Sequence, residues 1–188
     1  MNEEHIKQLL LWYEGEPLDG ELRGGLRETP KRYLKAMDEW TSGYKVDPAS
    51  LLKTFDDGAE GYDEMVLVKD IPVYSLCEHH LAPFFGTAVV GYIPSGRVVG
   101  LSKVARVVDA YARRFQVQER LTTQIADLLH KELRPRGVGV LLRCRHLCME
   151  SRGVRTPGSF TITSSLQGAM RLLPEAREEF LRLAQGDR

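Results

Sequence analysis

Residues 65–77, MVLVKDIPVYSLC, and residues 84–94, FFGTAVVGYIP, are two extended segments rich in β-branched and aromatic side chains, with a short turn between them. This pattern predicts two neighbouring strands. A second pair follows at residues 137–149 (GVGVLLRCRHLCM) and 159–167 (SFTITSSLQ). Strands that come in pairs, rather than alternating singly with helices, favour an antiparallel sheet. The sequence therefore predicts the α+β fold class.

Apolar residues at helical spacing predict helices before, between and after these strand pairs. The predicted helices cover residues 3–13, 30–42, 101–115 and 118–133, and a last helix begins at Pro174. The expected order is two helices, two strands, two helices, two strands and one helix. We expect a single domain, 1–188, composed of N-terminal helices (1–54), a core (63–170) and a C-terminal helix (174–186).

The composition is that of a globular protein with balanced charge. Of the 188 residues, 43% are hydrophobic, and 26 basic residues balance 26 acidic ones. A nucleic-acid-binding protein usually has a basic excess, so this class is disfavoured. No apolar run approaches the length of a membrane span. The acidic start MNEEHIK lacks the basic residues followed by an apolar run that are typical of a secretion signal. With three cysteines and no export signal, we expect reduced thiols and a cytoplasmic location.

Potential metal ligands are concentrated in two short segments, 77–80 (CEHH) and 144–148 (CRHLC). These segments contain all three cysteines and three of the five histidines, and mixed Cys and His donors are typical of zinc. A strand over 137–149 would point His146 and Cys148 to the same face, with Cys144 further along it. Each cysteine alone could instead be a small buried hydrophobic side chain, but the joint pattern favours a metal site.

The number of ligands separates a catalytic from a structural zinc site. Cys77, His80 and Cys148 would leave one of four positions open for a water molecule, whose pKa zinc lowers to about 7. His79 and His146 would then be free to transfer protons. If either of these histidines completes the coordination, the site is structural, and the residues alone leave both possibilities open.

Basic residues also occur where a helix does not favour them. Ser102 is predicted to cap a helix that carries Lys103 and Arg106 in its first turn, where both oppose the helix dipole. A bound anion would explain them. Arg32 and Lys35, three residues apart on an earlier helix, could contribute to the same polyphosphate site. The alternative is an ordinary solvated basic face.

Gln118 and Glu119 stand at the start of the next predicted helix. An acidic residue in this position is favourable for the helix dipole alone. A carboxylate there could also accept two N–H hydrogen bonds from the edge of a purine. Periodicity does not choose between these interpretations.

Seven short motifs, in order along the chain, resemble those of the GTP cyclohydrolase I family. They are 29–32 (TPKR), 77–80 (CEHH), 91–94 (GYIP), 100–103 (GLSK), 117–120 (VQER), 146–149 (HLCM) and 152–153 (RG). The resemblance implies the tunnelling fold, a four-stranded antiparallel sheet with a helix pair inserted between the second and third strands, preceded by N-terminal helices. It also implies a toroidal homo-oligomer, typically a decamer, with active sites at the subunit interfaces.

The resemblance further implies a reaction and residue roles. The reaction is hydrolytic opening of the imidazole ring of GTP, release of formate and rearrangement to 7,8-dihydroneopterin triphosphate, the first step of tetrahydrofolate and pterin biosynthesis. The implied zinc ligands are Cys77, His80 and Cys148, and the implied catalytic residues are His79, His146 and Ser102. The implied GTP-binding residues are Gln118, Glu119, Arg32, Lys35, Lys103, Arg106, Arg152 and Glu78. Cys144 has no counterpart in the family pattern, and we expect it to be a packing cysteine.

Two alternatives belong to other functional classes. A nitrile reductase of the same fold would use a nucleophilic cysteine and NADPH. The paired histidines, and Cys148 at a zinc-ligand position, argue against this enzyme. A zinc-stabilised assembly or binding module would have four protein ligands and no cluster of basic residues for a polyphosphate.

Overall fold

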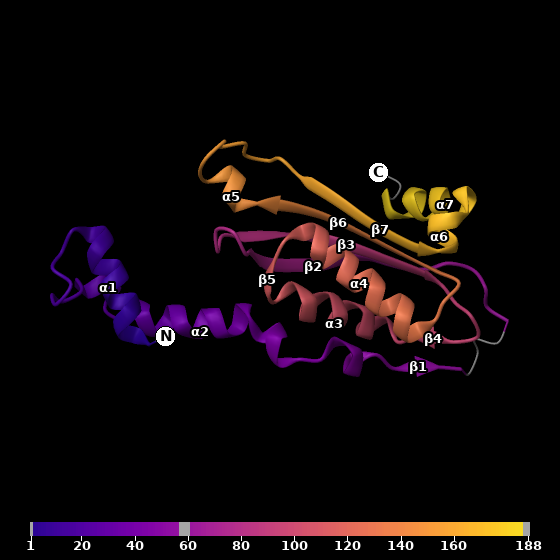
Figure 1. Cartoon of the computed structure of the whole chain (residues 1–188), viewed down its shortest axis with the longest axis horizontal. Coiled ribbons are helices and arrows are strands. Elements are labelled where there is room, and N and C mark those ends of the chain that lie inside the picture. The colour runs from indigo at the N-terminus through magenta and orange to yellow at the C-terminus, as the bar shows by residue number, and fades with distance from the viewer. Residues whose placement is uncertain (1, 57–60, 186–188) are drawn as a thin grey trace. The chain divides into compact units, whose positions relative to one another are not determined.

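A computed structural model describes residues 2–56 and 61–185 (Figure 1). The chain divides into two compact units, Met1–Thr41 and Ser42–Arg188. The first unit contains α1 (Glu3–Glu14) and α2 (Thr29–Trp40). The short 3₁₀ helices Ser42–Lys45 and Pro48–Leu51 belong to the second unit.

The second unit is built on the predicted antiparallel sheet. Its four main strands are β2 (Val66–Cys77), β3 (Pro83–Ile93), β6 (Gly137–His146) and β7 (Thr161–Gly168), paired in that order. The two-residue strand β5 (Phe115–Gln116) adds to β2 in parallel, and β1 (Thr54–Phe55) pairs separately with β4 (Val98–Val99). The α+β, tunnelling-fold architecture is confirmed.

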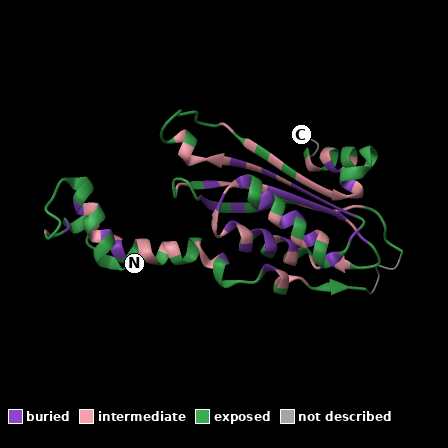
Figure 2. Cartoon of the chain, viewed as in Figure 1, coloured by how far each residue is buried: buried purple, intermediate pink, exposed green. Residues whose placement is uncertain are grey.

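Helices cover both faces of this sheet, as Figure 1 shows. The inserted pair α3 (Leu101–Ala112) and α4 (Gln118–Leu133) packs against one face through the main core. The short α6 (Ala169–Leu172) and α7 (Pro174–Gln185) pack against the other face. Because side chains alternate along a strand, successive residues of β3 and β6 pack in different cores. One core lies between the sheet and the α3–α4 pair, and the other lies between the sheet and α6–α7. Figure 2 accordingly shows buried residues along the central strands and on the sheet-facing sides of α3 and α4.

The β2–β3 hairpin has two ends that matter for function. Its closed end joins Leu76 to Pro83, next to the first group of potential ligands, and its open end pairs Val66 with Tyr92. The hydroxyl of Tyr92 accepts a hydrogen bond from the Val99 N–H, so α3 begins near the open end. The 12 residues of β2 separate these ends by about 35–40 Å at the usual rise of a strand.

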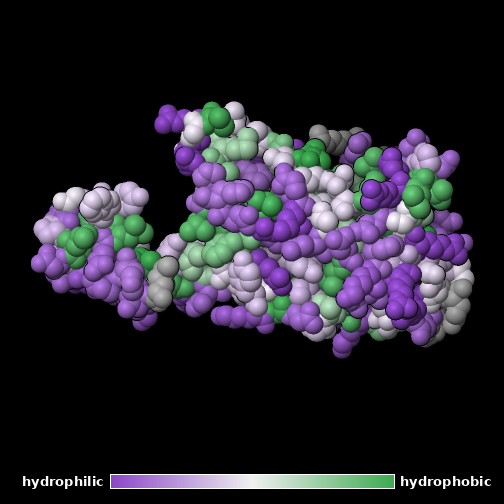
Figure 3. Space-filling view, viewed as in Figure 1, coloured by the Kyte–Doolittle hydropathy of each residue, from purple (hydrophilic) through white to green (hydrophobic). Residues whose placement is uncertain are grey.

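The face drawn in Figure 3 is mostly hydrophilic, with hydrophobic side chains in scattered patches. Among the described residues, no helix combines the length and the apolar character that a bilayer span demands.

Candidate metal centre and active site

The turn at the closed end of the β2–β3 hairpin brings Cys77 and His80 together. The Cys77 N–H donates to the carbonyl of Ala82 (2.9 Å), and the Leu81 N–H donates to the carbonyl of Cys77 (2.8 Å), which closes the turn. Leu81 has a positive φ of 53°, a left-handed backbone state that is uncommon for residues other than glycine. The Sγ of Cys77 consequently lies 3.6 Å from Nδ1 of His80.

Cys148 reaches the same place from a helical turn. Strand β6 ends at His146, and α5 (Leu147–Glu150) begins directly after it. The predicted strand over 137–149 is therefore three residues too long, and Cys148 does not share a strand face with His146 as predicted. The physical reason is pairing: the last β6–β7 pair is Cys144 with Thr161, and the last β3–β6 pair is Phe84 with His146.

Cys77, His80 and Cys148 form a three-residue donor group. Their ligand atoms all lie within 4.8 Å of one another, an arrangement that can hold a metal ion. Burial, and next the neighbouring Cys77 thiol, raise the pKa of Cys148. A cation among the donors would relieve the repulsion between two thiolates. Within residues 2–56 and 61–185, the group contains neither His79, whose Nδ1 lies 3.9 Å from Cys77 Sγ, nor His146.

Cys144 has a different environment from the other two thiols. Its side chain is fully buried in the core beneath α3 and α4 and lies outside the donor group. Burial raises the pKa of its thiol to about 12, so it is neutral at physiological pH. The structure thus agrees with its interpretation as a packing cysteine.

Two ion pairs support the segments that carry the donors. Arg120 on α4 pairs with the Glu78 carboxylate beside Cys77 and also donates to the carbonyl of Phe115 (3.0 Å). Arg145 on β6 binds the Glu150 carboxylate through two nitrogens, which ties the α5 turn back to its strand. These pairs lower the pKa of both carboxyl groups. The role of Glu78 in substrate binding stays a prediction, because its carboxylate is engaged with Arg120.

Replacing Glu150 with glutamine should weaken metal binding by about 10- to 100-fold, the usual cost of losing an outer-shell partner. The neutral amide loses the charge-assisted pair with Arg145 that holds the Cys148 turn. Competition with a chromophoric chelator measures this affinity. Glu132→Gln is the matched control, because Glu132 pairs with Lys131 on α4 and lies outside the donor group. An affinity equal in both variants would contradict the supporting role of Glu150.

His146, two residues before Cys148 in the chain, is held by two contacts. Its ring stacks on Phe84, with centroids 4.7 Å apart and planes 6° from parallel. Its Nε2 lies 2.8 Å from Oε1 of Gln118. Burial lowers the pKa of His146, and the carboxylate of Glu119 opposes this shift, so Glu119 lies within electrostatic reach of the ring. His79 is exposed on the turn next to His80.

The side chain of Gln118 points into the protein, and its expected role at the purine edge stays a prediction. Its side chain is 1% exposed, and its amide is hydrogen-bonded to groups of the protein on both its nitrogen and its oxygen. An amide so occupied has little capacity left for a ligand. The position at the start of α4 could be inferred from the sequence, but the inward direction of the side chain could not.

Within one chain, the predicted phosphate-binding residues do not all gather at the metal centre. Arg152 is near Cys148, since its charge lowers the pKa of that thiol against the larger effect of burial. Ser102, Lys103 and Arg106 lie at the start of α3, toward the open end of the β2–β3 hairpin. Ser102 is also not the N-cap, because α3 begins at Leu101 with Gly100 as the cap. Arg32 and Lys35 are exposed on α2 in the separate N-terminal unit.

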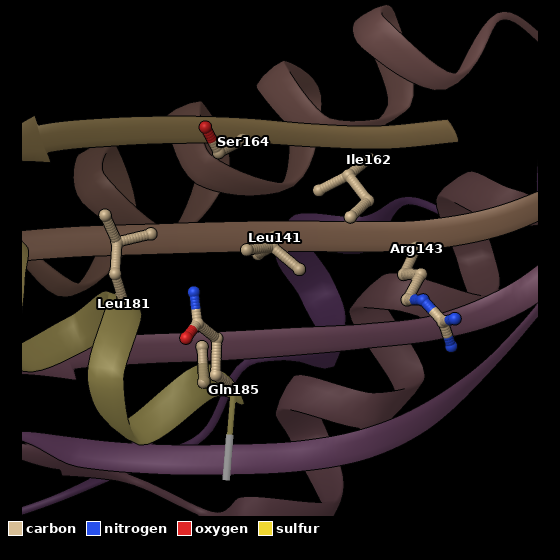
Figure 4. A pocket seen from close by; sticks show the side chains of 7 residues that line it. Leu141, Arg143, Ile162, Ser164, Leu181 and Gln185 are labelled. Atoms are coloured by element: carbon tan, nitrogen blue, oxygen red, sulfur yellow. The ribbon is translucent and has the colours of Figure 1, made fainter. Parts of the chain in front are cut away.

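A cavity of about 590 Å³ lies away from this centre, on the sheet face that carries α7 (Figure 4). Its lining comes from β6, β7 and α7 and includes Leu141, Arg143, Ile162 and Leu181. None of its lining residues is a cysteine or histidine. The cavity is therefore not the metal centre.

Comparison with known proteins agrees with the geometry. The family model described as GTP cyclohydrolase I matches residues 2–185. The GTP cyclohydrolase 1 of Janthinobacterium sp. (strain Marseille) is 61% identical over 94% of this chain and 87% of its own length. That of Aquifex aeolicus (strain VF5) is 50% identical over 99% of this chain and 98% of its own length. The chain therefore belongs to the GTP cyclohydrolase I family.

Proposed function

We propose that this chain is a zinc-dependent GTP cyclohydrolase I, which opens the imidazole ring of GTP, releases formate and forms 7,8-dihydroneopterin triphosphate in the first step of tetrahydrofolate and pterin biosynthesis. The observation that carries the proposal is the donor group of Cys77, His80 and Cys148, with His79 beside it and His146 two residues before Cys148 in the chain. Family membership supports the same reaction.

The donor group suits zinc in both chemistry and spacing. Two cysteines and one histidine are typical of a catalytic zinc site with three protein ligands. With Zn–S of about 2.3 Å and Zn–N of about 2.0–2.1 Å, tetrahedral coordination separates sulfur and nitrogen by about 3.6 Å. The distance from Cys77 Sγ to His80 Nδ1 is 3.6 Å. When bound, zinc supplies a Lewis acid that makes water nucleophilic at neutral pH.

The remaining residues would move protons and hold the substrate. His79, exposed beside the donor group, would protonate the guanine nitrogen next to the carbon that is lost as formate. His146 would serve the proton transfers of hydration and ring opening, and Ser102 the later steps at the ribose. Glu119, near His146, would accept the N–H edge of the guanine.

The triphosphate site requires more than one chain in this proposal. Arg152 lies near Cys148, but Ser102, Lys103 and Arg106 lie toward the other end of the hairpin. A neighbouring subunit would bring the start of its own α3 to this centre, together with Arg32 and Lys35 from an α2 helix. We therefore propose a cytoplasmic homo-oligomer, a decamer as in the family pattern, with active sites at the subunit interfaces.

The proposal is tested by incubating the purified protein with GTP. Formate release and a fluorescent pterin after oxidation are the expected products, and a zinc chelator should stop their formation. Consumption of NADPH with a nitrile substrate, without formate, would favour the reductase. Bound zinc with no turnover of GTP would favour a structural zinc protein.

Glu119→Ala should lower kcat/KM for GTP by about 10- to 100-fold, because a hydrogen-bonded carboxylate contributes roughly 1.5–3 kcal/mol. The preference for GTP over ATP should fall with it, since the donors of the guanine edge lose their acceptor. Steady-state kinetics with both nucleotides measures the change. Glu132→Ala, on the same helix, is the control that should leave the preference intact. Unchanged discrimination in Glu119→Ala would remove this residue from the proposed base site.

A further inference from the structure

The amide orientation of Gln118 is determined by its surroundings. Its nitrogen lies 3.0 Å from the carbonyl oxygen of Thr161 and 3.3 Å from that of Leu142. Carbonyl oxygens only accept hydrogen bonds, so the NH₂ group must face them. The amide oxygen is consequently the atom that faces Nε2 of His146, at 2.8 Å.

Two threonines extend the hydrogen-bond network around the Gln118 amide. The Thr122 hydroxyl lies 2.7 Å from the backbone carbonyl oxygen of Gln118 and can donate to it. Thr163 Oγ1 lies 2.6 Å from Thr122 Oγ1, and either hydroxyl can be the donor in this contact. The same Thr163 oxygen accepts from the Gln118 amide nitrogen, 3.0 Å away. Both threonines are thus compatible with the amide orientation that the two carbonyl oxygens require.

The network determines which nitrogen of His146 carries the hydrogen. An amide oxygen cannot donate, so Nε2 must be the donor in the 2.8 Å contact. The neutral ring then has its lone pair on Nδ1. No hydrogen bond joins Nδ1 to any group of residues 2–56 or 61–185. Stacking on Phe84 fixes the orientation of the ring plane. The hydrogen bond to Gln118 fixes the rotation of the ring within that plane.

We propose that Gln118 is a positioning residue that holds His146 as the Nε2–H tautomer and leaves Nδ1 as its only proton-accepting atom. The inference deepens the proposed function and rests on it for the catalytic part. A proton taken up at Nδ1 gives an imidazolium, and its return to substrate or water restores the same tautomer, so the ring is ready for the next transfer. This replaces the expected contact between Gln118 and guanine.

The tautomer is measured directly in the zinc-loaded full-length protein. Long-range ¹H–¹⁵N spectra of histidine-labelled protein, recorded where the ring is neutral, distinguish a protonated from an unprotonated nitrogen, and a His146→Asn spectrum assigns the ring. We expect Nε2 protonated and Nδ1 unprotonated. The opposite tautomer in the wild type would overturn the proposal, whatever the variants do.

The kinetics of Gln118→Met show whether Gln118 positions His146 or binds the guanine base. We expect kcat for GTP to fall by about 10- to 100-fold, as for loss of an outer-shell partner, with KM changed by less than about threefold. A raised KM with unchanged kcat would instead support contact with guanine. Gln124→Met is the matched control, because Gln124 is also an α4 amide and bonds Gln116 instead (2.9 Å). It should alter neither kcat nor the His146 spectrum.

A second variant covers the case in which Gln118→Met does not fold. Thr163→Val removes one acceptor of the Gln118 amide nitrogen and leaves the contact between Gln118 and His146 in place. We expect a smaller loss of kcat and a His146 spectrum that shows a minor second tautomer. Unaltered kcat and spectrum would contradict the network argument. If the wild type does not convert GTP, the proposed function fails, while the spectrum still decides the tautomer.

Discussion

Replacing Cys148 with alanine is expected to abolish stoichiometric zinc binding and to lower kcat for GTP by about a thousandfold or more. The variant leaves two of the three donors that lie within 4.8 Å of one another. A catalytic metal contributes several kcal/mol to the transition state, and each 1.36 kcal/mol is about a factor of ten in rate. Metal analysis after dialysis and the formate assay measure the two effects.

Two further variants separate the metal ligand from its neighbours. Cys144→Ala removes a thiol from the same segment but not from the donor group, and should retain zinc and turnover at a modest cost in stability. His79→Ala should retain zinc and GTP binding and lose turnover, because its proposed role is proton transfer. Loss of zinc in His79→Ala would show that this histidine is a ligand, and full zinc content in Cys148→Ala would overturn the assignment of the centre.

Gly86→Ala is expected to destabilise the Ser42–Arg188 unit by about 3–5 kcal/mol, among the largest effects of a single substitution. Gly86 lies in β3 opposite Cys144 of β6. A Cβ there would lie 2.0 Å from the carbonyl oxygen of Arg143 and 2.7 Å from Cα of Cys144. Backbone atoms cannot move aside without separating the two strands. Urea denaturation followed by far-UV circular dichroism measures the loss.

The metal centre should respond to the same substitution. The β3–β6 pairing at Gly86 is two residues from the pair of Phe84 with His146, where β6 gives way to the turn that carries Cys148. We expect zinc affinity to fall together with stability. Gly61→Ala is the control in the same unit, because a Cβ at Gly61 meets nothing within 4 Å. Equal stability of the two variants would contradict the close approach of β3 and β6.

Local patterns were sufficient for much of the fold. The strand pairs and the inserted helices were predictable because apolar spacing differs between strands and helices over short stretches of chain. Helix α4 begins and ends at the predicted residues, Gln118 and Leu133. The end of β6 was not predictable, because a strand stops where its partners stop, and those partners lie elsewhere in the sequence.

The sequence by itself determined the α+β class, the family resemblance and the two segments that hold Cys77, His80 and Cys148, because residue type and spacing along the chain carry that information. Only the tertiary structure decided that Cys148 lies on a helical turn and that Gln118 points inward to His146. It also showed that the start of α3 lies toward the other end of the hairpin from the metal centre. These facts depend on strand register and on contacts between residues distant in sequence, which no local pattern encodes.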